Sequence, residues 1–490
     1  MSRRPVIAFI LFALAGNAAG AMYYVDSASG DDAATGLSPA HAWKSLAKVN
    51  AIAFLAGDKI LFKCDTQYTG QLCPQGSGRE GEPIVITSYG KGSKPRIDGE
   101  GKSLDTVLIR NVEYWEISGL EVTNLGPDRQ PGRTGVRIVV DDYGTMHHIH
   151  LRNLYVHDVN GDLRKLREGC GIFFEARGGK DSRFDGLWIE DCHLVRTDRN
   201  GICQRRSGDA ARSVNVVIRG NLLEDIGGDA IKPWGSNGAL VEHNIVRGGR
   251  TRCDDYAAGI WPWDCDNTVI QFNEVSRMKG TKDGQAFDSD YRCRNTLFQY
   301  NYSHDNEGGF MLICSPGTSY CEGTVIRYNI SQNDGVNAAR VFHFGGGPKN
   351  TGIYNNVIYI GPGQNLPLLL FTEWDKGNAE NTYFYNNIFY VSGKVRYDWG
   401  KSRNNVFENN VFFGSHTESP ADPHAIPDAP PLIDPGSGDY GLLSVGGYRL
   451  REPTPQFLGR IVENNGGRDF FGNPVPQDKP PFIGVHQPRE

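Results

Sequence analysis

The chain has 490 residues, of which 51 are lysine or arginine and 57 are aspartate or glutamate, so its formal net charge at pH 7 is −6. This balance argues against the basic surface on which nucleic-acid binding depends. The apolar run 6-VIAFILFALA-15 has about half of the roughly 20 residues that a membrane-spanning helix needs, and no later run is long enough.

The first 21 residues have the pattern of an export signal. Arg3 and Arg4 precede the apolar run, and 19-AGA-21 supplies the small residues of a cleavage site. We therefore expect residues 1–21 to be removed and the mature chain to begin near Met22. The protein is predicted to be secreted or periplasmic.

The ten cysteines all follow this signal. An even number of cysteines in an exported chain indicates disulfides, and Cys64 with Cys73 and Cys314 with Cys321 have the closest spacings. No Cys-x-x-Cys or His-x-x-x-His spacing indicates a zinc site, so no metal site is predicted.

A repeat runs through most of the chain. Segments such as 295-NTLFQYNYSHDN-306 show apolar alternation, then Asn, then alternation again, and most steps between them are 23 to 31 residues. In the longer first step, Asp191 or Cys192 takes the place of Asn. This period predicts a parallel β-solenoid with three strands per rung, in which the asparagines stack inward as a ladder. They are Asn153, Asn221, Asn244, Asn273, Asn301, Asn329, Asn356, Asn387 and Asn410.

Several segments resemble known proteins. The stretches 23–51, 57–63, 82–99 and 446–486 are similar to the terminal parts of right-handed parallel β-helix proteins of the pectate-lyase-like superfamily. The resemblance implies an all-β fold: a single right-handed parallel β-helix over residues 22–490, with about ten or more rungs. It also implies an N-terminal cap at 22–60 and an irregular C-terminal cap at 415–490. A solenoid capped at both ends is expected to be a monomer.

The strands that follow the ladder can be aligned rung by rung. Each begins with an inward apolar residue, such as Ile260, Phe287, Met311, Val341 and Leu370. Alternation then places two columns of side chains outside. One column is Phe173, Cys203, Lys232, Trp261, Asp288, Leu312 and Phe342; the other is Glu175, Arg205, Trp234, Trp263, Asp290, Cys314, Phe344 and Glu373.

Two aspartates, Asp288 and Asp290, therefore share one face with tryptophans and basic side chains. Flat apolar rings beside a few charged groups are typical of sugar sites. The stretches 287-FDSD-290 and 300-YNYSHDN-306 resemble glycoside hydrolase family 141. That resemblance and the carboxylate pair together predict a secreted enzyme that hydrolyses glycosidic bonds of a polysaccharide or oligosaccharide, without a cofactor.

Roles can be assigned within this hypothesis. Asp288 and Asp290 are the central catalytic pair, and the turns that enter the strands add an acidic row of Asp229, Asp255, Asp283 and Glu307. Asp255 and Glu307 are the alternative catalytic partners. The predicted substrate-binding residues are Trp234, Trp261, Trp263, His304, Lys232, Arg205 and Glu175, with the tryptophans as stacking platforms and His304 as a neighbour that tunes a pKa.

Two other functions fit the same residues. A polysaccharide lyase would use Lys232 as the base and Ca²⁺, held by aspartates, to acidify the proton of a uronate. A non-catalytic glycan-binding β-helix would show the aromatic stripe but would not need clustered carboxylates. Asp288 and Asp290 at the floor of a groove favour an enzyme, whereas a flat convex face favours binding.

Overall fold

The computed structural model describes residues 20–488, except 168 and 338. The predicted signal lies almost wholly outside the described residues, so export stays a prediction. Within the described part of the chain, every helix is too short or too polar to span a membrane.

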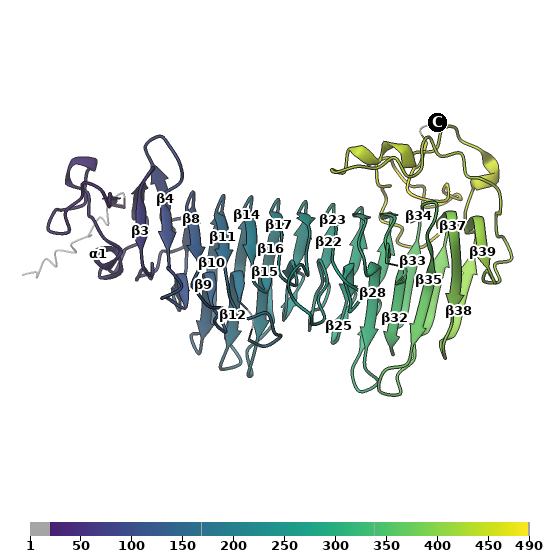
Figure 1. Ribbon diagram of the computed structural model, residues 1–490, viewed down its shortest axis with the longest axis horizontal. Helices are drawn as coiled ribbons and strands as arrows, with labels where there is room; N and C mark the ends of the chain where they lie inside the picture. Colours follow the sequence, from purple (N-terminus) through teal and green to yellow (C-terminus); the bar gives the residue numbers. More distant parts are fainter. Residues whose placement is uncertain (1–19, 168, 338, 489–490) are drawn as a thin grey trace, which may run out of the picture.

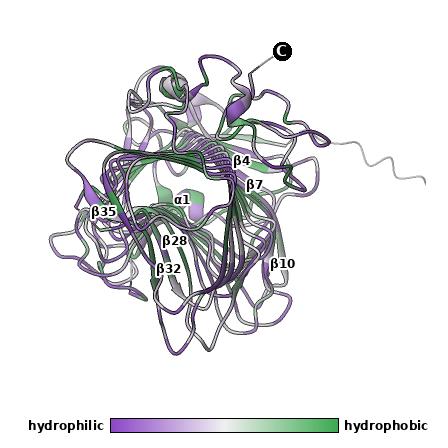
Figure 2. Cartoon of the chain, turned by 90° about the vertical axis from the view of Figure 1, so that its right-hand side faces the viewer, coloured by the Kyte–Doolittle hydropathy of each residue, from purple (hydrophilic) through white to green (hydrophobic). Residues whose placement is uncertain are grey.

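Almost all regular structure is short parallel strands wound into one elongated solenoid (Figure 1). Seen along the long axis, the strands form three faces around a common interior (Figure 2). We call these faces the first, second and third sheets. The all-β parallel solenoid is confirmed.

The first sheet consists of β1 (Met22–Val25), β2 (Lys59–Lys63), β4 (Ile84–Tyr89), β7 (Trp115–Ser118), β10 (Thr145–Arg152), β13 (Arg183–Glu190), β16 (Ser213–Arg219), β19 (Ser236–Asn237), β20 (Leu240–Glu242), β22 (Val269–Gln271), β25 (Cys293–Arg294), β26 (Leu297–Gln299), β29 (Cys321–Glu322), β30 (Val325–Arg327), β33 (Lys349–Tyr354), β36 (Glu380–Tyr385) and β38 (Arg403–Glu408). The second sheet consists of β3 (Gln67–Thr69), β5 (Arg96–Asp98), β8 (Glu121–Asn124), β11 (Tyr155–Val159), β14 (His193–Thr197), β17 (Leu222–Glu224), β21 (Ile245–Arg247), β23 (Glu274–Ser276), β27 (Tyr302–His304), β31 (Ile330–Gln332), β34 (Val357–Ile360), β37 (Ile388–Asp398) and β39 (Val411–Thr417).

The third sheet begins with β6 (Asp105–Arg110), β9 (Thr134–Asp141), β12 (Cys170–Arg177), β15 (Asn200–Arg206) and β18 (Ile231–Lys232). It continues through single bridges from Ile231 to Ile260 and from Ile260 to Phe287. The remaining strands are β24 (Gln285–Ser289), β28 (Gly309–Ser315), β32 (Phe342–Gly346) and β35 (Asn365–Thr372). This sheet carries the candidate site.

An asparagine ladder runs inside the solenoid from Asn221 to Asn410. Each side-chain amide donates to Oδ1 of the asparagine one rung further on, at 2.9–3.0 Å, and the last, Asn410, donates to Oδ2 of Asp422. The backbone N–H of Cys192 donates to Oδ1 of Asn221, so Cys192 stands where the ladder begins. Buried backbone groups at this corner are thereby satisfied, and the predicted ladder is confirmed over this range.

Asn153 is an exception to the prediction. It is exposed and adopts a φ of 53°, and Leu154 takes the inward position. Asn tolerates the left-handed conformation better than most residues, which explains an Asn at this exposed corner without a ladder bond.

The register of the third sheet also differs from the alignment at its C-terminal rungs. Met311 pairs with Phe342, not with Val341, and Leu312 pairs with His343. A slip of one residue exchanges the two faces of a strand. Phe342 and Phe344, predicted to point outward, are therefore fully buried in the core, and His343 takes the outward place.

The two ends of the chain cover different surfaces. Helix α1 (Leu46–Asn50), with η1 (Pro39–His41) before it, lies across the N-terminal end, where Leu46 and Val49 join the core (Figures 1 and 2). The C-terminal segment, residues 418–488, contains η2 (Ser444–Tyr448) and η3 (Pro455–Phe457). It folds back over the outward side of the second sheet, where its apolar side chains pack on Tyr302 and Ile330. It is thus a strap along the solenoid more than a cap on its end (Figure 1).

Candidate active site

Asp288 and Asp290 lie side by side on the outward side of the third sheet. Asp288 belongs to β24 and Asp290 follows it directly; they are 2% and 7% exposed. Cys314, from the neighbouring strand β28, donates its thiol hydrogen to Oδ1 of Asp290 at 3.3 Å and faces Oδ1 of Asp288 at 3.8 Å. One oxygen of each aspartate and the sulfur all lie within 4.8 Å of one another.

The environment separates the pKa values of the two aspartates. Burial and the negative charges of Asp290 and Asp283 raise the pKa of Asp288 well above its ordinary value. Burial also raises the pKa of Asp290, but only to about 6, because the backbone N–H of Tyr291, the charge of Lys165 and the thiol of Cys314 favour its ionised form. The ionised form is therefore less disfavoured at Asp290 than at Asp288, and such a division suits acid–base chemistry.

Lys165 supplies the main positive charge at this site. It lies in the insertion 160–169, and its ammonium group is 5.9 Å from the ring centre of Trp261 and 5.6 Å from that of Tyr256. Its charge lowers the pKa of both Asp288 and Asp290. The sequence alone did not identify it, and the only signal was an insertion of polar residues in one rung of the repeat.

The predicted acidic row does not act as one group. Asp229 is fully buried, accepts hydrogen bonds from Trp261 Nε1 and the backbone of Ala258 at 3.0 Å, and lies 3.5 Å from Arg199 and Lys232. These cations lower the pKa of Asp229 against the effect of burial. Asp229 is therefore an ionised structural partner.

Asp255 and Glu307, the predicted alternative partners, are held by basic groups. Asp255 lies 3.4 Å from Arg199, and Glu307 lies 3.1 Å from Lys279 and accepts the N–H of Gly280 at 2.5 Å. The pKa of each carboxyl is lowered, although burial opposes this. Neither is placed as a protonated partner for Asp290, and the role of each as an alternative catalytic partner stays a prediction.

Asp283 is the member of the acidic row whose charge acts on Asp288 and Asp290. Burial raises its pKa, and its charge raises the pKa of both Asp288 and Asp290. Its side chain is half-buried, so it is more accessible than Asp288. The sequence placed Asp283 in the row but gave no reason to select it, because the burial that raises its pKa, and the N–H of Tyr256 and the charge of Arg199 that lower the pKa of Asp255, depend on how the rungs pack.

The three tryptophans have different environments. Trp234 and Trp263 stack with their ring centres 5.1 Å apart, are half-buried, and their indole N–H groups have no hydrogen-bond partner among the described residues. They remain candidates for sugar binding. Trp261 is 2% exposed and bonded to Asp229, so it is a buried support and not an open platform.

The charged residues of the two columns, Lys232, Arg205 and Glu175, contact aromatic rings or oppositely charged side chains of the protein itself. Lys232 is 2% exposed, with its ammonium group 5.6 Å from the ring centre of Trp234 and 5.1 Å from that of Trp261. Arg205 lies over Trp234 at 5.6 Å and lines a cavity of about 230 Å³. Glu175 is 5% exposed and paired with Arg137 and Arg177, so it orients arginines and is shielded from a ligand.

His304 is not brought to the aspartates. It lies in β27 of the second sheet, where its ring contacts Asp305, Glu274 and Tyr440 under the C-terminal strap. The two carboxylates raise its pKa to about 9, against the effect of burial. The prediction that His304 neighbours the pair is wrong, because β27 and β24 lie on different faces of the solenoid.

Fold and comparisons agree on the class of protein: the chain is a right-handed parallel β-helix. A family model described as a right handed beta helix region matches residues 170–358. A solved structure of XylC with xylose covers 95% of this chain and 98% of its own, with a TM-score of 0.54 and 12% identity, a likeness that shows the fold alone.

Two relatives are closer in sequence. Lacto-N-biosidase of Bifidobacterium longum subsp. longum is 31% identical over an alignment that covers 70% of this chain and 27% of that protein. The chain thus spans about a quarter of the length of this curated relative. The crystal structure of a GH136 lacto-N-biosidase from Eubacterium ramulus is 28% identical with a TM-score of 0.62, covering 74% of this chain and 67% of that chain. The name of the Eubacterium ramulus protein assigns that protein to family GH136.

Proposed function

We propose that the chain is a glycoside hydrolase that acts on an oligosaccharide through carboxyl groups of the third sheet. The observation that carries this proposal is the buried carboxyl pair on the third sheet, in which the pKa of Asp290 is raised to about 6 and that of Asp288 well above its ordinary value. The names of the two lacto-N-biosidase relatives support the same reaction class and an oligosaccharide substrate.

Asp290 is the ionised carboxylate that acts on the anomeric carbon, directly or through water. Asp283 is the general acid, because its pKa is raised and its half-buried side chain can reach the oxygen of a leaving group. Asp288 is almost inaccessible, and its raised pKa favours its protonated form beside Asp290. Trp234 and Trp263, whose rings are half-buried and stacked on each other, offer apolar ring faces to sugar rings.

The lyase alternative is less well supported by the geometry. Lys232 is buried between two indole rings, 3.5 Å from Asp229, and this position leaves little room for it to act as a base on a polymer. The cluster of Asp288, Asp290 and Cys314 contains a thiol, which is a poor ligand for Ca²⁺.

The test compares three variants, Asp283→Asn, Asp288→Asn and Asp290→Asn, on natural oligosaccharides and on aryl glycosides with a good leaving group. We expect Asp290→Asn to be inactive on both. Asp283→Asn should be inactive on oligosaccharides but retain activity on the aryl glycosides, which need no acid. Asp288→Asn should retain activity on both, with an altered pH profile. Full activity of Asp290→Asn on either substrate would refute the assignment.

The same reactions separate the alternatives. Release of reducing ends without the ultraviolet absorbance of a new C4–C5 double bond, unchanged by EDTA, supports hydrolysis. Absorbance that EDTA abolishes supports the lyase. Glycan binding with neither product supports a binding β-helix.

Export and the monomeric state belong to the same proposal. N-terminal sequencing of the protein from the culture medium or periplasm should begin near Met22. Sedimentation should give a mass close to that of one mature chain.

A further inference from the structure

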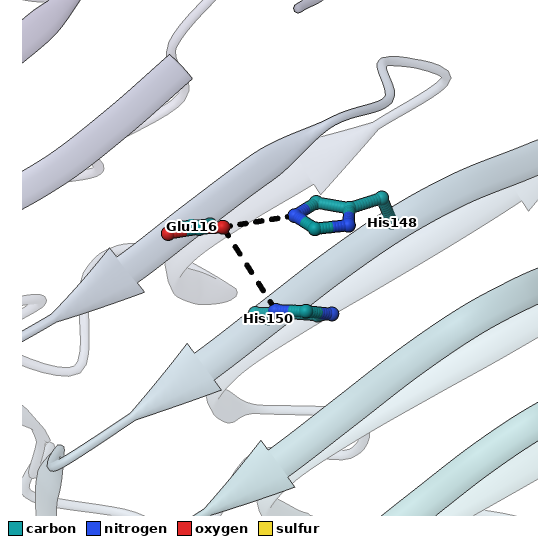
Figure 3. Close-up of side chains that lie close together, drawn as sticks. All are labelled: Glu116, His148 and His150. Atoms are coloured by element: carbon teal, nitrogen blue, oxygen red, sulfur yellow. Dashed lines mark hydrogen bonds and ion pairs between the residues drawn. The ribbon is translucent and has the colours of Figure 1, made fainter. Parts of the chain in front are cut away.

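A second cluster of reactive side chains lies on the outward side of the first sheet, away from the carboxyl site. It contains Glu116 of β7 and His148 and His150 of β10, the next rung (Figure 3). Oε1 of Glu116 lies 2.9 Å from Nε2 of His148 and 4.0 Å from Nδ1 of His150. One ligand atom from each residue lies within 4.8 Å of the other two.

Aromatic neighbours hold the two imidazole rings. The ring centres of His148 and His150 are 3.9 Å apart, Tyr114 stacks beyond His148 at 5.9 Å, and Trp188 stacks beyond His150 at 4.5 Å with an interplanar angle of 9°. This four-ring stack limits rotation of the imidazoles. Both present a nitrogen to the same carboxylate, as Figure 3 shows.

Two imidazole nitrogens and one carboxylate oxygen form a ligand set that suits Zn²⁺, Cu²⁺ and Ni²⁺, whereas Ca²⁺ and Mg²⁺ prefer oxygen alone. We propose that Glu116, His148 and His150 bind one divalent transition-metal ion such as Zn²⁺. The bound ion links the β7 rung to the β10 rung.

The distances fit this ion with a small adjustment. Zinc bonds of about 2.0–2.1 Å place tetrahedral ligand atoms roughly 3.3 Å apart. The 4.0 Å pair must therefore close and the 2.9 Å pair open, each by less than about 1 Å, and the two histidine nitrogens start within 4.8 Å of each other. The side chains of Glu116, His148 and His150 are 40%, 33% and 20% exposed, which gives an ion access and leaves room for water as the remaining ligand.

The site acts on the stability of the solenoid and not on catalysis. It joins adjacent rungs of the first sheet, whereas Asp288 and Asp290 project from the third. Zinc bound here should therefore raise the melting temperature and slow hydrogen exchange of β7 and β10, with no change in the hydrolytic rate.

The experiment uses the full chain without a polyhistidine tag, freed of metal with EDTA, and titrates it with Zn²⁺ by calorimetry and with Co²⁺ by visible absorption. The wild type is compared with Glu116→Gln, His148→Gln and His150→Gln. The matched control is His147→Gln, because His147 is adjacent and half-buried like the triad histidines but is bonded to Glu113 at 2.6 Å.

We expect the wild type and His147→Gln to bind one equivalent at this site and each triad variant to bind about tenfold or more weakly. Binding that persists in the triad variants but is lost in Cys314→Ser belongs to the Asp288, Asp290 and Cys314 cluster. Failure of the wild type to bind, or equal binding by the triad variants, overturns the proposal. If a variant fails to fold, zinc-dependent protection of β7 and β10 from exchange in the wild type decides the question, and its absence also overturns the proposal.

Discussion

The thiol of Cys314 donates to Oδ1 of Asp290 across two adjacent rungs, at 3.3 Å, and lowers the pKa of that carboxyl. A buried sulfur thus acts as a hydrogen-bond donor to the group that we assign as the ionised catalyst. In the wild type, Asp290 must lose its proton for activity, so kcat/KM should rise with pH through a value of about 6.

Replacing Cys314 with alanine removes this donor. We expect the acidic limb of the kcat/KM profile to move to higher pH by about 0.5–1 unit, equivalent to about 1 kcal/mol. Cys314→Ser retains a donor and should leave the limb near its original place. An unchanged limb in the alanine variant would show that the thiol does not stabilise the ionised form.

Lys165 favours the ionised form of Asp290 by charge. Lys165→Gln should therefore also move the acidic limb upward, by about 1 unit, and Lys165→Arg should not. The difference between these variants should decrease as salt is added, because ions screen the interaction. A limb that moves equally in both variants would indicate a steric effect of the 160–169 insertion.

The buried carboxyl of Asp290 should cost the protein stability at neutral pH. Its pKa is about 6 in the folded state against 3.8 in the unfolded state, so the folded state retains the proton longer and stability falls as pH rises from about 4 to 6. Asp290→Asn should therefore be more stable than the wild type above pH 6, by up to about 3 kcal/mol, and equal to it near pH 3.

Thermal unfolding at several pH values checks this prediction, with Asp255→Asn as the control. The pKa of Asp255 is lowered, chiefly by its hydrogen bonds and by Arg199, so its carboxylate adds stability above the unfolded pKa. That control should lose stability at neutral pH. Equal shifts of the same sign in both variants would contradict the assignment of the two environments.

The asparagine ladder should make a large contribution to the free energy of unfolding at every rung. The side chain of Asn301 donates to the carbonyl of Ile270 and to Asn329, and its Oδ1 accepts from Asn273. Asn301→Ala leaves these buried groups unpaired and should cost about 1–3 kcal/mol. The exposed Asn153→Gly should cost less than about 0.5 kcal/mol, because glycine also accepts the left-handed φ of 53° at this position. Denaturant unfolding compares the two, and equal losses would contradict the ladder interpretation.

The cysteines provide a test of the disulfide prediction. The structure describes all ten as free thiols, eight of them buried and Cys64 and Cys73 half-buried. A thiol reagent should therefore modify about two groups in the native protein and ten after unfolding in denaturant. A total below ten would show that the protein forms disulfides after all.

Much of the fold followed from one repeated residue. The ladder from Asn221 to Asn410 was predictable because an inward Asn must recur at the same corner of every rung. The one-residue register shift at Phe342 was not predictable. Val341 and Phe342 are both apolar, so alternation alone does not decide which of them points inward. Composition likewise could not distinguish the inward Asn221 from the exposed Asn153.

Only the part of the site that lies on one strand was predictable from the sequence. Asp288 and Asp290 share a face by alternation, and that much needs no neighbours. The roles of Asp255, Asp283 and Glu307 depend on cations that other rungs and loops contribute, among them Arg199, Lys165 and Lys279. No spacing in the sequence reports which cation meets which carboxyl.

The C-terminal strap has a consequence for the order in which the chain is made. Rungs of a solenoid can stack on earlier rungs as they are synthesised, but the strap packs on Tyr302, Ile330, Val357 and Ile388, which precede most of it by more than about 50 residues. Until the strap has been synthesised, this apolar strip stays open to water and to other nascent chains. A product that lacks the strap would keep the strip exposed permanently, so the strap protects the molecule from aggregation.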